Sequence, residues 1–218
     1  MRLILGVLLL LSGATAFAQD ARVTPEDRTP RRVATTGYTL ALSWAPEYCQ
    51  RRRGDAECAL PSAQGFTLHG LWPDGADPKV WPQYCHVGGA LTPAELRAGE
   101  GATPSPRLLQ HEWDKHGSCM SANPAAYFAE EARLYRTIRF PDMAALARRR
   151  DLTTGTMTRA FAAANPGVTP AMVRLNLNRH GWLEEVWLCL GPDKRPRACP
   201  AGVETPSPAT RVRVQAPA

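Results

Sequence analysis

The alternation of apolar and polar side chains along the chain predicts four strands. Residues 38–44 alternate and are followed by Pro46, which is typical of a half-buried strand that ends at a turn. A short apolar run at 65–69 predicts a second strand, with His69 at its end, before a cluster of turn residues. Two further strands are expected late in the chain, at 173–178 and 182–190.

Helical spacing and capping residues mark the segments between these strands. Helices are expected at 93–97, 108–116, 124–138, 143–149 and 157–164, with a further turn at 170–174. The first carries a capping box, because Thr92 precedes Pro93 and is followed three positions later by Glu95. The segments 47–61 and 74–106 are expected to be mostly loop. Strands separated by helices, with a hairpin near the end, predict an α+β domain.

The two ends of the chain differ from the middle. Residues 1–18 have a basic start, an apolar run and the triplet Ala16-Phe17-Ala18, which is typical of a cleaved signal peptide. The apolar run is too short to span a bilayer, so we expect a mature protein that begins at Gln19, is periplasmic or secreted and has no membrane partner. The expected parts are a flexible arm at 19–36, a folded domain at 37–200 and a disordered, proline-rich tail at 201–218.

Size and charge add little about function. The chain has 218 residues, enough for one domain with a substantial core, and carries 26 Lys and Arg against 20 Asp and Glu. Removing Arg2 with the signal peptide lowers the net charge from +6 to +5. This mild basicity is compatible with a polyanionic substrate but does not identify one.

The six cysteines of an exported chain predict disulfides. Six cysteines allow 15 pairings, and the sequence alone does not choose among them. Proximity in the sequence favours the bridges Cys49–Cys58 and Cys189–Cys199. These two bridges would leave Cys85 to pair with Cys119. A cysteine-ligated metal is disfavoured, because the chain has no C-x-x-C motif.

The segment from His111 to Cys119 holds two imidazoles, two carboxylates, an ammonium and a thiol. On a helix that turns about 100° per residue, Lys115, His116 and Cys119 share a face with Glu112, and His111 lies just beyond its edge. A face that combines acid, base and cation costs free energy to bury and is unusual as plain core. The segment is therefore either a reactive site or a solvated helix surface.

A zinc site of the H-E-x-x-H type is disfavoured on this helix. That motif needs a second histidine at i+4, but the residue four positions after His111 is Lys115, and His116 stands at i+5. A cation thus occupies the position of a ligand. We expect no metal and no other cofactor.

Two segments together carry a more specific signal. They are His69-Gly70-Leu71-Trp72-Pro73 and His111-Glu112-Trp113-Asp114-Lys115-His116-Gly117-Ser118-Cys119, and in both sequence and order they resemble the catalytic segments of the ribonuclease T2 family. The family prefers Thr where Ser118 stands. The resemblance runs from about Tyr38 to about Cys199 and implies a central, mostly antiparallel sheet with several flanking helices, stapled by disulfides. It places residues 38–44 centrally in the sheet and implies the same Cys85–Cys119 pair.

The resemblance also implies a role for each matching residue. His116 would take the proton of a ribose 2′-OH, and His69 would protonate the leaving 5′-oxygen. Glu112 and Lys115 would stabilise the pentacoordinate phosphorus, and Glu112 could also set the charge of the imidazoles. Substrate-binding roles are implied for His111 on phosphate, for Trp72 stacked on a base and for Asp74 at a base edge.

These groups suit the cleavage of RNA without a metal. RNA carries its own nucleophile, the 2′-OH next to the scissile phosphorus, which DNA lacks. Two histidines supply a base and an acid near neutral pH, and a fixed cation stabilises the charge that develops. We expect a monomeric endoribonuclease of the ribonuclease T2 type, which cleaves single-stranded RNA through a 2′,3′-cyclic phosphate to 3′-phosphate ends with broad base preference.

Two alternatives stay open on the sequence alone. A catalytically inactive, secreted RNA-binding or interaction protein could use the same scaffold, although all five catalytic residue types are present. A metal-dependent phosphodiesterase is disfavoured by the i,i+5 spacing of the histidines. An RNA digestion assay distinguishes the endoribonuclease from the inactive binding protein. Identification of a cyclic phosphate product distinguishes it from the metal-dependent phosphodiesterase.

Overall fold

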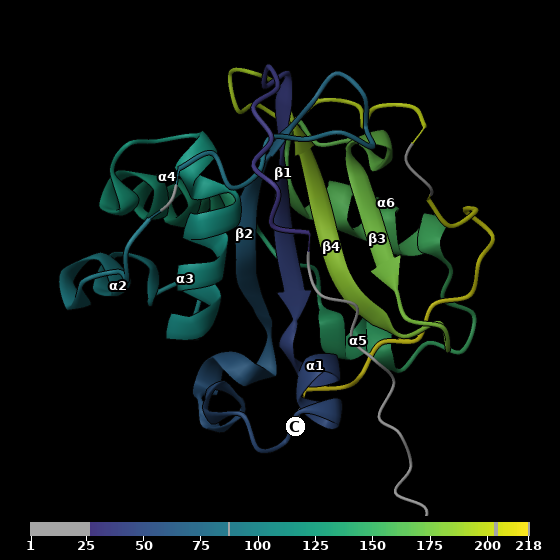
Figure 1. Ribbon diagram of the computed structural model, residues 1–218. Helices are drawn as coiled ribbons and strands as arrows, with labels where there is room; N and C mark the ends of the chain where they lie inside the picture. The colour runs from purple at the N-terminus through teal and green to yellow at the C-terminus, as the bar shows by residue number, and fades with distance from the viewer. Residues whose placement is uncertain (1–26, 87, 203–204, 218) are drawn as a thin grey trace, which may run out of the picture.

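A computed structural model of the chain describes residues 27–86, 88–202 and 205–217, so the predicted signal peptide lies outside the described residues. Four strands form one antiparallel sheet in the order β2-β1-β4-β3. They are β1 (Gly37–Trp44), β2 (Phe66–Asp74), β3 (Val173–Leu177) and β4 (Leu183–Leu190). The expected α+β class is confirmed, and β1 has the expected central position, with β2 and β3 at the edges (Figure 1).

The α-helices of the described ranges surround this sheet. They are α1 (Ala45–Arg51), α2 (Pro93–Gly99), α3 (Pro106–Lys115), α4 (Pro124–Thr137), α5 (Met143–Ala147) and α6 (Thr154–Ala164). The predicted capping box is present in α2, where Thr92 and Glu95 bond to each other's backbone. Helices α2, α3 and α4 lie beside the edge strand β2, and α6 lies behind the sheet (Figure 1). None of these helices is long and apolar enough to cross a membrane.

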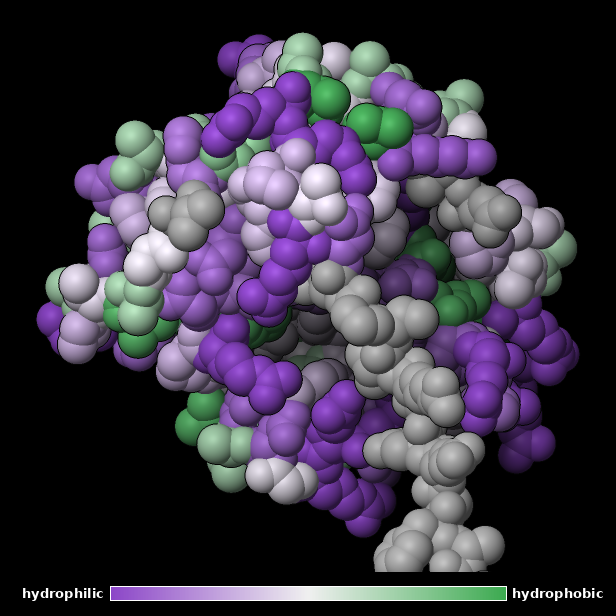
Figure 2. All heavy atoms as spheres, in the orientation of Figure 1, coloured by the Kyte–Doolittle hydropathy of each residue, from purple (hydrophilic) through white to green (hydrophobic). Residues whose placement is uncertain are grey.

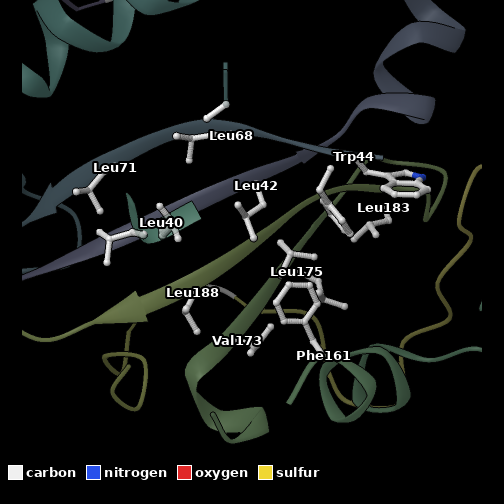
Figure 3. Close-up of a cluster of buried hydrophobic side chains, with 14 of the residues drawn as sticks. Leu40, Leu42, Trp44, Leu68, Leu71, Phe161, Val173, Leu175, Leu183 and Leu188 are labelled. Carbon is white, nitrogen blue, oxygen red and sulfur yellow. The ribbon is translucent and has the colours of Figure 1, made fainter. Parts of the chain in front are cut away.

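The hydrophobic core lies against one face of the sheet. Along β1, Leu40, Leu42 and Trp44 point to this face and are at most 1% exposed. Figure 3 shows them beside apolar side chains of the other strands and of α6, among them Leu68, Leu71, Val173, Leu175, Leu188 and Phe161. The intervening residues of β1 point to the opposite face, because side chains alternate along a strand. That second face is therefore available for polar groups.

Strand β2 continues to Asp74, whereas the sequence predicts a strand that ends at His69. Its pairing with β1 shifts register so that His69 is the extra residue of a β-bulge between Leu68 and Gly70. The strand tolerates Pro73 because β2 is an edge strand, where the missing N–H leaves no inner ladder bond unmade. His69 therefore lies within the strand and not at its end.

Helix α1 corrects the expectation of a loop over 47–61. Pro46 lies in its first turn, and Arg51 in its last turn is 3.6 Å from Oε1 of Glu47. These are ordinary signals for the start and end of a helix. The helix has only seven residues, which is too short for apolar periodicity to reveal it.

The N-terminal arm is held in place where the structure describes it, contrary to the expected flexibility. In its described part, 27–36, the backbone of Arg31 exchanges hydrogen bonds of 2.8 and 3.0 Å with Gln83. The buried side chain of Gln83 also donates to the carbonyl oxygens of Asp27 and Thr29, both at 3.1 Å. These long-range bonds could not be deduced from the polar composition of the arm.

The described part of the C-terminal tail, 205–217, corrects the expectation of disorder. Val212 and Val214 are each 5% exposed and belong to the core. The backbone N–H of Leu183 donates to the carbonyl of Arg213 at 2.8 Å. Valine and arginine alternate at 211–214, as in a half-buried strand, and the prolines nearby hid this pattern.

The three disulfides are the pairs favoured by proximity and resemblance, and the described residues contain no free cysteine. The Cys85–Cys119 bridge spans 34 residues. It joins the loop after β2 to the 3₁₀ turn Gly117–Cys119, which directly follows α3. The bridge therefore fixes the end of α3 relative to the β2 side of the fold.

Replacing the long bridge with serines, in C85S/C119S, should lower the free energy of unfolding by about 3–4 kcal/mol, because a bridge over a longer loop restricts the unfolded chain more. The control C189S/C199S removes a bridge over 10 residues and should cost roughly 1 kcal/mol less. Guanidinium unfolding followed by tryptophan fluorescence measures both. An equal loss in the two variants would contradict the dependence on loop length.

Candidate active site

The residues of the expected site meet where α3 packs against β2. The helix begins and ends slightly earlier than the predicted 108–116, and His116 is the first residue after it, with a φ of −113°. Leu109 and Trp113 face the core and are 0% and 7% exposed. Their burial turns the side chain of Glu112, which is 1% exposed, towards the strand.

Gly70 allows the helix to come this close to the strand. A Cβ atom at Gly70 would lie 2.1 Å from Oε2 of Glu112 and 2.9 Å from Nε1 of Trp72. That indole nitrogen donates a hydrogen bond to Oε2 of Glu112 at 2.7 Å. Any larger residue at this position would therefore push apart the bond that joins α3 to β2.

His69 lies between two carboxylates. Its Nδ1 is 2.5 Å from Oε1 of Glu185 on β4, and its Nε2 is 3.4 Å from Oε1 of Glu112. Burial by itself would lower the pKa of His69, but the contacts and charges of Glu112 and Glu185 outweigh burial and raise the pKa to about 10. His69 is therefore protonated at neutral pH.

His116 has the opposite protonation state. It is 6% exposed, and its Nδ1 has no hydrogen-bond partner among the described residues. Burial lowers the pKa of His116 to about 4; the charge of Glu112 opposes this shift, and nearby positive charge, that of Lys115 first, adds to it. The imidazole of His116 is therefore neutral at neutral pH.

The indole of Trp72 holds the two histidines in one cluster. His116 stacks on it, with ring centroids 5.4 Å apart and an angle of 28° between the planes. His69 meets it edge to face at 5.1 Å and 82°, and Trp187 of β4 does so at 5.4 Å and 78°. Trp72 is thus partly buried within the cluster, so it contributes packing whatever contact it makes with a base.

Glu112 is ionised although it is buried. Burial would raise its pKa, but the hydrogen bond and charge of His69 keep the pKa below the usual value. His111 is partly exposed, with its Nε2 4.0 Å from Oε1 of Glu112. Lys115 lies in the last turn of α3 and acts on His116 through its charge. The expected catalytic residues and His111 thus share one electrostatic environment.

Asp74 lies further along β2 than this cluster. It is two residues beyond Trp72 and so points to the same face of the sheet. Its carboxylate accepts a hydrogen bond from Oγ1 of Thr39 at 3.1 Å. Burial raises the pKa of Asp74, which the Thr39 hydroxyl and nearby arginines oppose. A contact with a base edge would have to share this carboxylate with Thr39.

Glu185 is a site residue that sequence reasoning missed. It lies in β4, 116 positions from His69 along the chain, where the sequence predicts a strand at 182–190 and no site residue. The available signal was two consecutive acids, Glu184 and Glu185, in an otherwise apolar strand. Since one of two neighbouring strand residues must face the sheet's polar side, one of these carboxylates had to find a partner there.

Glu131 of α4 is a second unexpected acid, and it lies behind the site. It is 0% exposed, and neither carboxyl oxygen has a hydrogen-bond partner that meets strict geometry in the described chain. Burial, and then the charge of Glu112, raise the pKa of Glu131 to about 8. The neutral acid is therefore its main form at neutral pH.

No group of three or more His, Cys, Asp or Glu side chains in the described ranges is arranged to hold a metal ion.

Comparisons with known proteins identify the family of this chain. A model of the ribonuclease T2 family matches residues 35–199. The match covers most of the chain and includes both motif segments. The chain belongs to the ribonuclease T2 family.

Named relatives are similar to part of this chain, and a solved structure shares its fold. A probable ribonuclease of Haemophilus influenzae is 35% identical over 119 residues, which cover 48% of this chain and 44% of that protein. A ribonuclease of Aeromonas hydrophila is 40% identical over 82 residues, or 38% and 36% of the two chains. The chain thus spans less than half the length of these two curated relatives. Trichomaglin, an S-like ribonuclease, shares the fold with a TM-score of 0.62 at 23% identity, over 79% of this chain and 95% of its own.

The substitution Glu131→Gln should flatten the pH dependence of stability. Because the folded-state pKa of Glu131 is raised from 4.5 to about 8, its contribution is complete below about 4.5 and is lost as the pH rises to about 8. The wild type should lose up to about 1.4 kcal/mol per pH unit in this window relative to the variant. Urea unfolding at several pH values measures the difference.

The neighbouring Glu130 provides the control. Its hydrogen bond to Arg133, opposed by burial and aided by Lys194, lowers its pKa to about 2, so its contribution is lost as the pH falls and not as it rises. Glu130→Gln should therefore leave the wild-type slope between pH 4.5 and about 8 in place. A Glu131→Gln variant with that same slope would show that Glu131 is ionised in the fold.

Proposed function

We propose that the protein is an exported, metal-independent endoribonuclease that cleaves single-stranded RNA by attack of a ribose 2′-OH on the adjacent phosphorus. Membership of the ribonuclease T2 family supports the reaction class. The observation that carries the proposal is a pair of histidines around one indole, His69 held protonated and His116 held neutral. A general acid and a general base for one reaction need these opposite states.

The proposed cleavage uses both histidines in one step. The neutral His116 takes the 2′-OH proton while the 2′-oxygen bonds to phosphorus. His69 gives its proton to the 5′-oxygen as the phosphorus–5′-oxygen bond breaks. The product is a 2′,3′-cyclic phosphate, which water then opens to a 3′-phosphate with the two roles reversed.

The charged residues of α3 assist this step in different ways. Lys115 stabilises the negative charge on the phosphoryl oxygens, because a fixed cation acts most strongly on the transition state. His111, which is partly exposed beside the cluster, binds the phosphate. Glu112 is itself negative, so it acts through the imidazoles: its buried charge helps to keep His69 protonated.

Broad base preference follows from the residues assigned to the base. Stacking on Trp72 would be tolerant of sequence, since every base has a π-face. Asp74 would accept a hydrogen bond from a base edge, although Thr39 already engages it. The N-terminal signal motif supports export to the periplasm or the medium, and we expect the mature enzyme to act as a monomer without a cofactor.

His69→Ala and His116→Ala should each reduce cleavage of single-stranded RNA by about 10²–10⁴-fold, because each removes one proton-transfer group. His180→Ala is the matched control, since His180 is exposed in the hairpin turn between β3 and β4. The measurement is kcat/KM on a defined oligoribonucleotide, with circular dichroism to check the fold. Wild-type rates in either folded site variant would refute the assignment.

EDTA should leave the rate of the wild type unchanged, because the nucleophile belongs to the substrate and the proposed acid, base and cation are side chains. Mass analysis of early products should find 2′,3′-cyclic phosphate ends, and a substrate with a single 2′-deoxyribose should resist cleavage at that position. Inactivation by EDTA that a divalent ion reverses would restore the metal-dependent alternative. RNA that binds but is never cleaved would support the inactive scaffold.

A further inference from the structure

The carboxylate of Glu185 is held by partners on all four strands of the sheet. Its Oε2 accepts hydrogen bonds from Nε1 of Trp187 at 2.8 Å and from Nδ2 of Asn176 at 3.4 Å. Its Oε1 accepts from the hydroxyl of Ser43 at 3.3 Å, in addition to its contact with His69. The side chain is only 12% exposed. An anion with this many donors on separate strands has little freedom to move.

This carboxylate reaches His69 across the central strand. His69 is on β2 and Glu185 on β4, with β1 between them, so their backbones are about 10 Å apart. The β1 residues beneath this gap are Ala41 and Ser43, which are small. Their size leaves room above β1 for the imidazole and the carboxylate to meet, and the bulge at His69 turns its ring to this side.

The contact distinguishes the two nitrogens of His69. Nδ1 lies 2.5 Å from Glu185, whereas Nε2 lies on the other side, towards Glu112 and the remainder of the cluster. Only Nε2 is therefore placed to give a proton to substrate. When it does so, a neutral His69 keeps its Nδ1 proton in the hydrogen bond to Glu185.

We propose that Glu185 is a positioning residue for RNA cleavage: it binds the Nδ1 proton of His69 throughout the reaction and so directs the Nε2 proton to the leaving 5′-oxygen. This inference rests on the proposed function, because the leaving oxygen is that of an RNA phosphodiester. It assigns to β4 a part in the reaction that the two motif segments do not contain. Glu185 acts through His69 and need not touch the substrate.

The charges around His69 make the effect of Glu185 measurable. Glu112 on α3 and Glu185 on β4 face the ring directly, the neutral His116 and the partly exposed His111 of the α3 segment lie beside Glu112, and Glu131 of α4 lies behind Glu112. Removing the charge of Glu185 leaves a single carboxylate beside His69. The pKa of His69 should then fall by about 1–3 units, the usual effect of one close opposite charge.

The test compares Glu185→Gln with the wild type and with Glu184→Gln. Gln keeps the size of the side chain and an oxygen acceptor for Trp187. Glu184 is the adjacent acid of β4, but its Oε1 pairs with Nη2 of Arg51 and does not face His69. The substitution Glu184→Gln therefore removes the same charge from β4 without changing the contact with His69. Two readouts are needed: the pKa of His69 from NMR titration of its ring, and the pH dependence of kcat and KM on a defined oligoribonucleotide.

In the wild type and in Glu184→Gln, kcat/KM should fall as the pH rises through the pKa of His69 in the free protein, about 10. In Glu185→Gln this fall should begin about 1–3 pH units lower, together with the NMR-detected pKa, while KM changes less than about twofold. Glu185→Asp, which keeps the charge but shortens the side chain, should recover part of the shift. It also serves as the test variant if Glu185→Gln does not fold.

Two results would overturn the inference. One is an unchanged pKa of His69 in folded Glu185→Gln; the other is a loss confined to KM, which would indicate substrate contact. The NMR titration requires no RNA, so it decides whether Glu185 controls His69 even if the wild type forms no cyclic phosphate. That last outcome would refute the proposed function, and the two failures therefore remain distinct.

Discussion

The approach of α3 to β2 at Gly70 is the constraint on which the site depends. Only a residue without a side chain lets the carboxylate of Glu112 bond to Trp72 across this contact. The burial of Leu109 and Trp113 presses the helix into place from the other side, and the Cys85–Cys119 bridge holds its end. The candidate active site is therefore formed by the packing of a helix against the sheet, and it does not lie on a separate loop.

The buried carboxylate of Glu112 lies near two histidines whose pKa values are shifted in opposite directions. Glu112 raises the pKa of both rings, but His69 has a second carboxylate beside it, whereas His116 is buried against an indole and close to Lys115. The difference in protonation between the two rings thus comes from their surroundings, since the two side chains are chemically the same. Figure 2 shows that the visible face of the molecule carries mostly hydrophilic residues.

Local sequence patterns predicted those elements that depend only on residues close together in the chain. The capping box at Thr92, the alternation in 38–44 and the spacing of the α3 segment need only nearby residues, and the structure contains the elements they predict. Glu185 could not be found this way, because its partner lies two strands away and the meeting requires small residues on β1. The prediction of a disordered tail was wrong for a similar reason. Val212 and Val214 are buried in the core by packing against distant parts of the chain, and the composition of the tail contains no information about that packing.

The bulge at His69 explains both a failed prediction and the design of the site. Before it, Leu68 faces the core, and after it Leu71 does, so the alternation of β2 changes phase between them. A reading based on strict alternation has to end the strand at that point. The change of phase is what lets His69, Gly70 and Trp72 serve the polar face together, since in a regular strand Gly70 and Trp72 would share the core face with Leu68. The residue at which the sequence pattern breaks is therefore the one that the fold turns towards the candidate site.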